Sequence, residues 1–102
     1  MNAATIYKEN NVVGPVMRQG DLAKAVAEAA EVDNPDKTIA VDDKVAYLRI
    51  QTDGEMIIRR QTIEEALGRP FQMRQLEIDL SSFAGRIEMT ADQVRFYFNR
   101  QL

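Results

Sequence analysis

The sequence contains neither cysteine nor histidine among its 102 residues. Without cysteine there are no disulfides and no thiolate nucleophiles, and without histidine there is no imidazole to act as a base. The two absences also remove nearly all ligand sets for zinc, copper, haem and iron–sulfur clusters, so only carboxylate oxygens remain for a metal. We therefore expect a protein that binds no cofactor and no metal.

Positive charge and long apolar runs are also scarce. The chain has 13 Lys and Arg against 16 Asp and Glu, a net charge of -3, whereas a nucleic-acid backbone selects a basic face. No apolar run approaches the about 20 residues that span a membrane, and the N-terminus has no hydrophobic segment of the secretory kind. We expect no nucleic-acid partner, no membrane association and a cytoplasmic location.

The length corresponds to one domain that can bury a core of its own. Residues 1–10 are polar and show no hydrophobic period, which predicts a flexible N-terminal arm followed by a single folded domain over residues 11–102. Val12–Met17 is typical of a short strand. Pro15 lacks a backbone N–H and predicts an edge or a bulge for that strand.

The strongest local pattern is the stretch Val45–Arg60, which predicts a β-hairpin. Asp53-Gly54 tolerates positive φ at a tight turn, and apolar residues alternate with polar ones on either side. A two-stranded ribbon is marginal in water, so its apolar face needs further strands and a helix.

Two helices are predicted from capping residues and apolar spacing. The first begins at Asp21 and has a face of mostly small residues at helical spacing: Leu22, Ala25, Val26, Ala29 and Ala30. The second begins with a capping box formed by Thr62 and Glu65, and ends at Gly68 in the left-handed conformation.

The C-terminal third predicts further strands. Residues 72–80 alternate between apolar and charged positions, Ser81–Gly85 makes at most one helical turn, and residues 86–89 and 94–98 form a second hairpin. The predicted fold is α+β, a small single domain of mainly antiparallel strands in two short sheets with two to three helices. Six residues are expected in the core: Leu48, Ile50, Ile58, Leu76, Ile78 and Phe96.

Catalytic groups are hard to find. The carboxylate pairs Asp42-Asp43 and Glu64-Glu65 are typical of a turn and a helix cap, and Ser81-Ser82 has no histidine to activate it. The residues themselves therefore favour a small cofactorless binding or regulatory domain over an enzyme.

The string LGRPFQMRQLEIDLSSFAGRI, Leu67–Ile87, resembles the effector (coupling, or regulatory) proteins of soluble multicomponent di-iron monooxygenases, most closely the toluene monooxygenase group. The resemblance continues through NNVVGPVMRQGD, AEVDNP, AYLRIQTDGE, TIEEALGRPF and QVRFYF, in the same order, and covers nearly everything after Asn10. We expect no counterpart of the long N-terminal extension of methane monooxygenase effectors, because the arm here has about ten residues.

This resemblance implies a non-catalytic component without a prosthetic group, which is a monomer when free and binds the di-iron hydroxylase of its own system. It would tune substrate access, oxygen activation and the coupling of NADH use to hydroxylation of an aromatic substrate, in competition with the electron-donor component. The residues implied at the hydroxylase surface are Asn34, Pro35, Asp79, Ser81, Ser82, Phe83, Ala84, Gly85 and Arg86.

Two alternatives remain open from sequence. A generic small protein-binding module would have the same composition without any effect on catalysis. Phe83, in turn, fits either an apolar anchor at an interface centre or a core residue.

Overall fold

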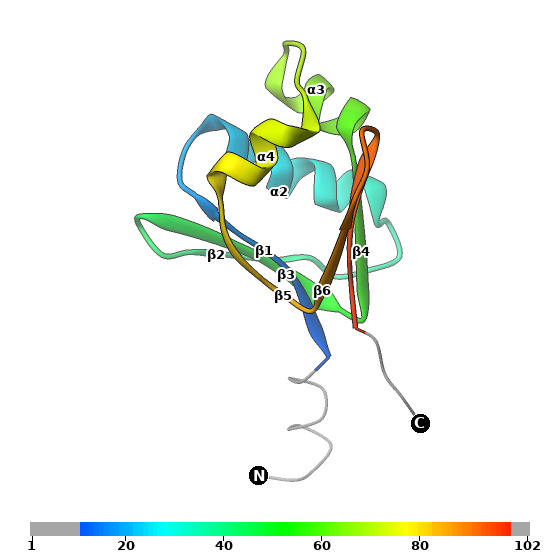
Figure 1. The fold of residues 1–102 in the computed structure, drawn as a ribbon. Helices are drawn as coiled ribbons and strands as arrows, with labels where there is room; N and C mark the ends of the chain where they lie inside the picture. Colours follow the sequence, from blue (N-terminus) through cyan, green and yellow to red (C-terminus); the bar gives the residue numbers. More distant parts are fainter. Residues whose placement is uncertain (1–10, 99–102) are drawn as a thin grey trace, which may run out of the picture.

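The computed structural model describes residues 11–98. The predicted arm, residues 1–10, lies outside the described residues, as do residues 99–102, so the arm stays a prediction. Within the described part the chain forms two antiparallel sheets and three helices (Figure 1). In chain order the elements are β1 (Val12–Arg18), α2 (Asp21–Asp33), β2 (Ala40–Asp43), β3 (Tyr47–Asp53), β4 (Glu55–Arg59), α3 (Arg60–Leu67), α4 (Met73–Asp79), β5 (Leu80–Ala84), β6 (Arg86–Met89) and β7 (Gln93–Tyr97).

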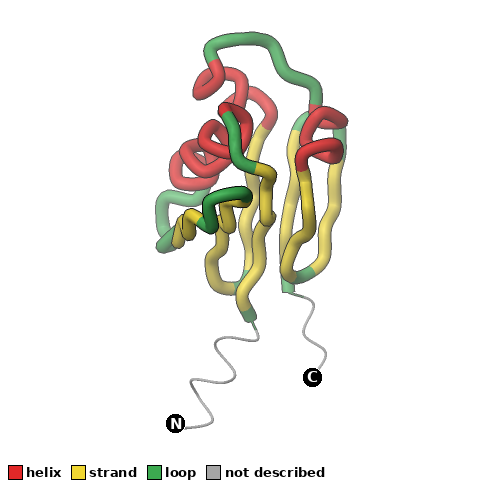
Figure 2. The backbone as a smooth tube through the Cα atoms, turned by 90° about the vertical axis from the view of Figure 1, so that its left-hand side faces the viewer, coloured by secondary structure: helices red, strands yellow, loops and turns green. Residues whose placement is uncertain are grey.

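The strands divide into two sheets. One has four strands in the order β2-β3-β1-β5, and the other has three in the order β4-β7-β6. Helices α2 and α3 lie side by side, α4 lies apart from them, and the three-stranded sheet stands beside the four-stranded one (Figure 2). The predicted α+β class, with two short antiparallel sheets and up to three helices, is confirmed.

The chain passes between the sheets three times, and two of these passages are made at a single glycine. Gly54 joins β3 to β4 and Gly85 joins β5 to β6, with φ angles of 86° and 88° that glycine adopts most readily. The Gly54 N–H donates to the Asn11 carbonyl at 2.8 Å, and the Gly54 carbonyl accepts from the Phe98 N–H at 2.9 Å. The start of β1 and the residue after β7 therefore meet at the same corner.

The hairpin predicted for Val45–Arg60 is wrong in its pairing. β3 pairs with β1 and β2, whereas β4 pairs with β7 in the other sheet. A two-residue turn would have folded β4 back onto β3, but Asp53 still belongs to β3 and only Gly54 separates the strands. The second predicted hairpin, made by β6 and β7, is confirmed.

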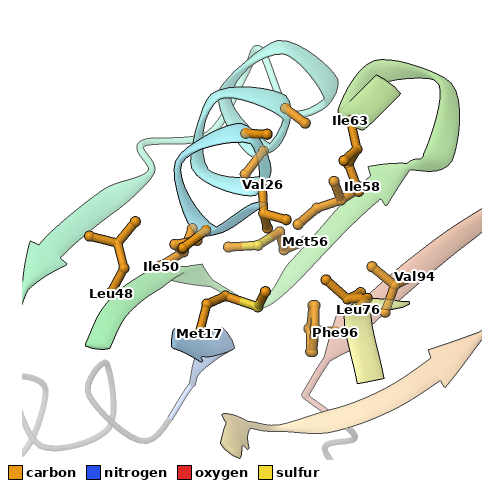
Figure 3. Packing of buried hydrophobic residues seen from close by; sticks show 14 of the residues in the cluster. Met17, Val26, Leu48, Ile50, Met56, Ile58, Ile63, Leu76, Val94 and Phe96 are labelled. Atoms are coloured by element: carbon orange, nitrogen blue, oxygen red, sulfur yellow. The ribbon is translucent and has the colours of Figure 1, made fainter. Parts of the chain in front are cut away.

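The small-residue face of α2 packs into the core as predicted. Ala25, Val26, Ala29 and Ala30 are buried, and the side chain of Val26 lies above those of Ile50 and Met56 (Figure 3). Small side chains let the helix axis approach the sheet closely. Five of the six predicted core residues are buried: Leu48, Ile50, Ile58, Leu76 and Phe96.

The prediction was wrong for residues 72–85. Met73–Asp79 is helix α4 rather than a strand, and it leaves Ile78 73% exposed. The helix buries Met73 and Leu76, which are three residues apart, and a capping box of Gln72 and Gln75 begins it. The helical turn predicted for Ser81–Gly85 is also wrong, because Leu80–Ala84 is strand β5.

Local signals elsewhere gave mixed results. Pro15 lies in β1, an inner strand, so its predicted edge position is wrong, although the pairing with β5 shifts register after Val16. Helix α3 begins at Arg60, and the Thr62 hydroxyl donates to Asp33 Oδ1 at 2.8 Å instead of capping. Gly68 ends α3 in the left-handed conformation, as predicted.

Leu48 and Ile78 provide a matched test of these assignments. Leu48→Ala is expected to lower the free energy of unfolding by about 2 to 5 kcal/mol because it empties a buried position. Ile78→Ala is expected to change it by less than about 0.5 kcal/mol because its side chain is mostly in water. Urea unfolding of both variants measures the two values, and a similar cost for each would contradict the helical assignment of residues 73–79.

Candidate functional site

The segment singled out by the family resemblance lies along an open sheet edge. β5 is an edge strand of the four-stranded sheet, β6 is an edge strand of the three-stranded sheet, and only Gly85 separates them. Together they make one bent edge from Leu80 to Met89. Within residues 11–98 no side chain is hydrogen-bonded to the backbone of Leu80–Ala84, so the outward peptide groups of β5 are open to a partner.

Small exposed side chains line this edge. Ser81, Ser82 and Ala84 are all exposed, and Ser82 and Ala84 face away from the helices because they lie opposite Val16 and Gly14 of β1. This helix-free face of the four-stranded sheet contains a shallow depression of about 300 Å³. Its lining residues are Gly14, Val16, Arg49, Gln51, Ser82, Phe83 and Ala84. The backbone of a partner can approach such a surface closely.

Phe83 combines the two roles left open from sequence. It lies opposite Pro15 in the sheet register, and its ring centroid is 6.1 Å from that of the buried Phe96. The side chain is nevertheless 41% exposed. The inner part of the ring therefore packs against the core, while the outer part is available for contact.

The residues at the two ends of the segment differ in kind. Asp79 is the last residue of α4 and is partly exposed, and Arg86 is exposed with no ion-pair partner among residues 11–98. Gly85 has a structural requirement: a Cβ there would lie 2.7 Å from Val13 Cγ1 and 2.8 Å from the Tyr97 carbonyl oxygen. The corner therefore needs glycine whether or not a partner contacts it.

Asn34 and Pro35 lie elsewhere, beyond the end of α2. The Asn34 side-chain NH₂ donates to the carbonyls of Ala30 and Ile57, both at 2.8 Å, and its Oδ1 accepts from the Ile57 N–H at 3.1 Å. Asp33 Oδ2 also accepts from the Arg59 N–H at 2.8 Å. These two side chains close the free edge of β4, at the opposite edge of the three-stranded sheet from β6. Asn34 is buried and only Pro35 is exposed.

Asn34→Ala is expected to destabilise the protein by about 2 to 4 kcal/mol, because the backbone N–H and carbonyl of Ile57 both lose their hydrogen-bond partner. Pro35→Ala is the matched control at the neighbouring exposed position, with an expected cost below about 1 kcal/mol. Thermal melts of the free protein measure both. A cost near zero for Asn34→Ala would show that water replaces the amide fully at this edge.

A charged cluster covers the outer face of the three-stranded sheet. Arg95 of β7 bridges Glu55 of β4 and Glu88 of β6, and its guanidinium carbon lies 4.0 Å from the ring centroid of Tyr97. The hydrogen bond that Arg95 donates to the Glu55 carboxylate raises the pKa of Arg95 above its ordinary value. These ion pairs link the three strands β4, β7 and β6 on the surface of the sheet.

The described residues offer little catalytic chemistry. No three acidic side chains among residues 11–98 are grouped so that they could hold a metal ion. Ser81 and Ser82 are exposed and have no side-chain hydrogen bond to a base in this part of the chain. None of the helices over the same residues has the length and apolar character to cross a membrane. The arrangement suits binding.

Comparison with known proteins decides the family. The model of the MmoB/DmpM family matches residues 11–97. The chain belongs to the MmoB/DmpM family. The match begins one residue before β1 and ends with the last residue of β7, so it covers the whole of the two-sheet fold.

Named relatives of this MmoB/DmpM protein are monooxygenase components. It is 42% identical over 97 residues to the effector subunit of an alkene monooxygenase system from Xanthobacter autotrophicus (strain ATCC BAA-1158 / Py2), covering 95% of this chain and 96% of the relative. It is 30% identical over 84 residues to the stimulatory component DmpM of phenol 2-monooxygenase from Pseudomonas sp. (strain CF600), covering 82% and 91%. A chain in the solved structure of a phenol hydroxylase–regulatory protein complex superposes with a TM-score of 0.74 at 31% identity, covering 86% of this chain and 99% of the other.

These relatives confirm the effector-type assignment made from sequence. Their names describe effector and stimulatory components, so this MmoB/DmpM protein is a non-catalytic, regulatory member of a multicomponent monooxygenase. The named systems act on alkenes and phenol, and the closer similarity to the toluene group stays a prediction. The role of Asn34 at the edge of β4 is not predictable from the sequence, because neither Asp33 nor the turn at Pro35 indicates a contact with Ile57.

Proposed function

We propose that this protein is the effector subunit of a di-iron hydroxylase and binds that hydroxylase through the open edge Leu80–Met89 and the helix-free sheet face beside it. The observation that carries the proposal is the edge itself. It joins unpaired peptide groups, small exposed side chains at Ser81, Ser82 and Ala84, and a half-exposed Phe83 in one continuous surface. The solved structure of a related regulatory protein in complex with a phenol hydroxylase supports this choice of partner.

The mechanism we propose is a shift in hydroxylase conformation. A protein without catalytic groups alters catalysis only by binding one state of its partner more tightly than another. A surface of small side chains on a sheet suits this task, because rigid strands hold the contact atoms in place and small residues permit backbone approach. In this way the subunit would set substrate access and oxygen activation near the di-iron centre, and couple NADH use to hydroxylation.

The remaining parts of the proposal concern partners and compartment. We place the protein in the cytoplasm as a free monomer, and we propose that it competes with the electron-donor component for the hydroxylase. Asp79 and Arg86 supply the charged ends of the contact segment, and Pro35 offers a separate exposed position at the turn after α2. We propose an aromatic hydrocarbon as substrate of the complex. The name of the Xanthobacter relative favours an alkene as the second candidate.

The deciding experiment is a titration of this protein into the hydroxylase of its own system, with the reductase and ferredoxin present. Product formed and NADH consumed are measured together, with toluene and with a short alkene. We expect the ratio of product to NADH to rise and to saturate at a fixed stoichiometry. A generic binding module predicts no change in turnover or coupling, and that result would overturn the proposal.

Excess ferredoxin tests the competition. If the two components share a surface, raising the ferredoxin concentration is expected to raise the amount of effector needed for half-maximal coupling. An unchanged half-maximal concentration would indicate separate surfaces.

A further inference from the structure

The turn between β2 and β3 holds an aliphatic residue in an unfavourable position. Val45 has a φ of 69° and is the one non-glycine residue of 11–98 with positive φ. A β-branched side chain at this φ is a steric outlier, for which asparagine or glycine is usual, and the bond from the Ala46 N–H to the Lys44 carbonyl makes the turn a rare and strained γ-turn around Val45. The side chain is also 87% exposed, so burial within the described fold does not compensate for the strain.

The surrounding turn holds Val45 rigidly in this conformation. Its N–H donates to Asp43 Oδ1 at 2.8 Å, and Gln19 Nε2 donates to the same oxygen at 2.9 Å. The Ala46 N–H donates to the Lys44 carbonyl at 2.8 Å, and the Gln19 N–H donates to the Ala46 carbonyl at 3.0 Å. The backbone is thus fixed from both sides of the turn, and the valine points away from the molecule.

The turn lies at the end of the surface assigned to the hydroxylase. The β2–β3 hairpin projects from the body of the protein (Figure 1). Tyr47, 41% exposed, lies opposite Arg18 in the register and on the same helix-free face as Arg49, which lies opposite Val16. Val16 in turn lies opposite Ser82. An unbroken face therefore connects the hairpin to β5.

Two arginines on this face have no ion-pair partner in the described part of the chain. Arg18 and Arg49 form no ion pair among residues 11–98, and Asp42, the register partner of Arg49, bonds Lys44 at 3.1 Å instead. Unpaired cations beside an exposed aliphatic residue suit a recess with an apolar floor and an acidic rim.

We infer that Val45 is an anchor residue that inserts into an apolar recess with an acidic rim on the hydroxylase, a second contact point beyond the β5 edge. This inference rests on the proposed function. The strain and the exposure are both unfavourable in the free protein and are accounted for by contacts made only in the complex.

Val45→Asn tests the inference, because asparagine tolerates positive φ better than valine but is polar. The melting temperature of the free protein is expected to rise by about 3 to 6 °C as the strain is relieved. Affinity for the hydroxylase of the same system is expected to fall about ten-fold or more, since a buried valine contact is lost. Val45→Gly is the second variant and is expected to weaken binding to a similar extent. Val32→Gln, at a 62% exposed position of α2, is the matched control and is expected to bind within two-fold of the unchanged protein.

Each result has a definite meaning. Higher stability with weaker binding of Val45→Asn supports the anchor. Binding of both Val45 variants at the original affinity would overturn it, as would a lower melting temperature of Val45→Asn or an equal loss in Val32→Gln. If the unchanged protein itself does not bind the hydroxylase, the proposed function is wrong and the anchor with it.

Discussion

Gly14→Ala is expected to cost about 4 kcal/mol or more, most of the stability of a domain of this size. Gly14 lies in the inner strand β1 with a φ of 135°, which alanine rarely adopts. A Cβ built on Gly14 would lie 2.0 Å from the Ile50 carbonyl oxygen and 3.0 Å from Met56 Cε. The contact with Ile50 is with backbone of the adjacent strand, so a side-chain rotation does not relieve it.

Thermal unfolding measures this cost. A loss of 4 kcal/mol corresponds to a fall in melting temperature of roughly 16 to 32 °C for a domain of about 100 residues, and the variant is expected to be largely unfolded at 37 °C. Gly68→Ala is the matched control, because Gly68 also has positive φ but no neighbouring atom lies within 4 Å of its Cβ position. Its expected cost is about 1 kcal/mol. Equal melting temperatures for the two variants would mean that β1 and β3 separate easily at Gly14.

Sequence reasoning succeeded where a local pattern and the tertiary fold agree. The face of α2 that carries Val26 and Ala29 repeats at helical spacing and is buried. Gly68 ends α3 because its conformation is available to glycine at little cost, whatever the rest of the fold does. Leu48 and Ile50 were correctly predicted to be in the core, although their strand pairs with different strands than predicted. The alternation of apolar and polar residues shows which side chains face the core, but it does not show which strand lies alongside.

The predictions of secondary structure failed where both a helical and a strand periodicity fit the same residues. Leu76, Ile78 and Leu80 alternate as a strand would, but Met73 and Leu76 also fit a helix, and the helix leaves Ile78 in water. Strand β5 has no alternation at all, because its side chains are small or exposed. Its pairing with β1 is a long-range contact that a local pattern does not reveal.

The pairing of β3 and β4, the strands on either side of Gly54, was predicted wrongly for a related reason. An Asp-Gly dipeptide between two strands favours a hairpin, but the same positive φ serves equally at a corner between sheets. The hydrogen bonds that Gly54 donates to Asn11 and accepts from Phe98, residues at the two ends of the fold, are features of the corner. Residues so distant in sequence give no local signal.

The candidate site was located by family resemblance and not by chemistry. Ser81, Ser82 and Ala84 have no titratable group, and their significance depends on lying along an edge that spans two sheets. The strain at Val45 was equally invisible, since a valine after Asp43 and Lys44 has no unusual sequence pattern. Binding surfaces built from backbone and small side chains are poorly visible in composition.

Ala84→Leu and Ser82→Leu are expected to uncouple NADH consumption from hydroxylation while leaving the complex intact. Both positions are exposed on the helix-free face, so the stability of the free protein is expected to change by less than about 1 kcal/mol. A leucine there fills the shallow depression beside Gly14 and Val16 and holds the partner's backbone away. Displacement of reacting groups by about 1 Å from a remote change can cost up to 100-fold in rate, so product per NADH is expected to fall roughly ten-fold.

The measurement pairs affinity, by titration with the hydroxylase, against product formed per NADH consumed. Ala91→Leu is the matched control, because Ala91 is also an exposed alanine and lies in the turn between β6 and β7, at the other end of those strands from Gly85. We expect that control to leave affinity and coupling unchanged, and the Ala84 and Ser82 variants to lose coupling with an affinity change below about five-fold, since the contact area is enlarged and not removed. If both variants keep full coupling and the original product distribution while the complex still forms, the β5 edge does not carry the effector function. The hydroxylase contact that shifts its conformation would then have to lie elsewhere, with the exposed turn at Pro35 and the helix beginning at Asp21 as the next positions to substitute.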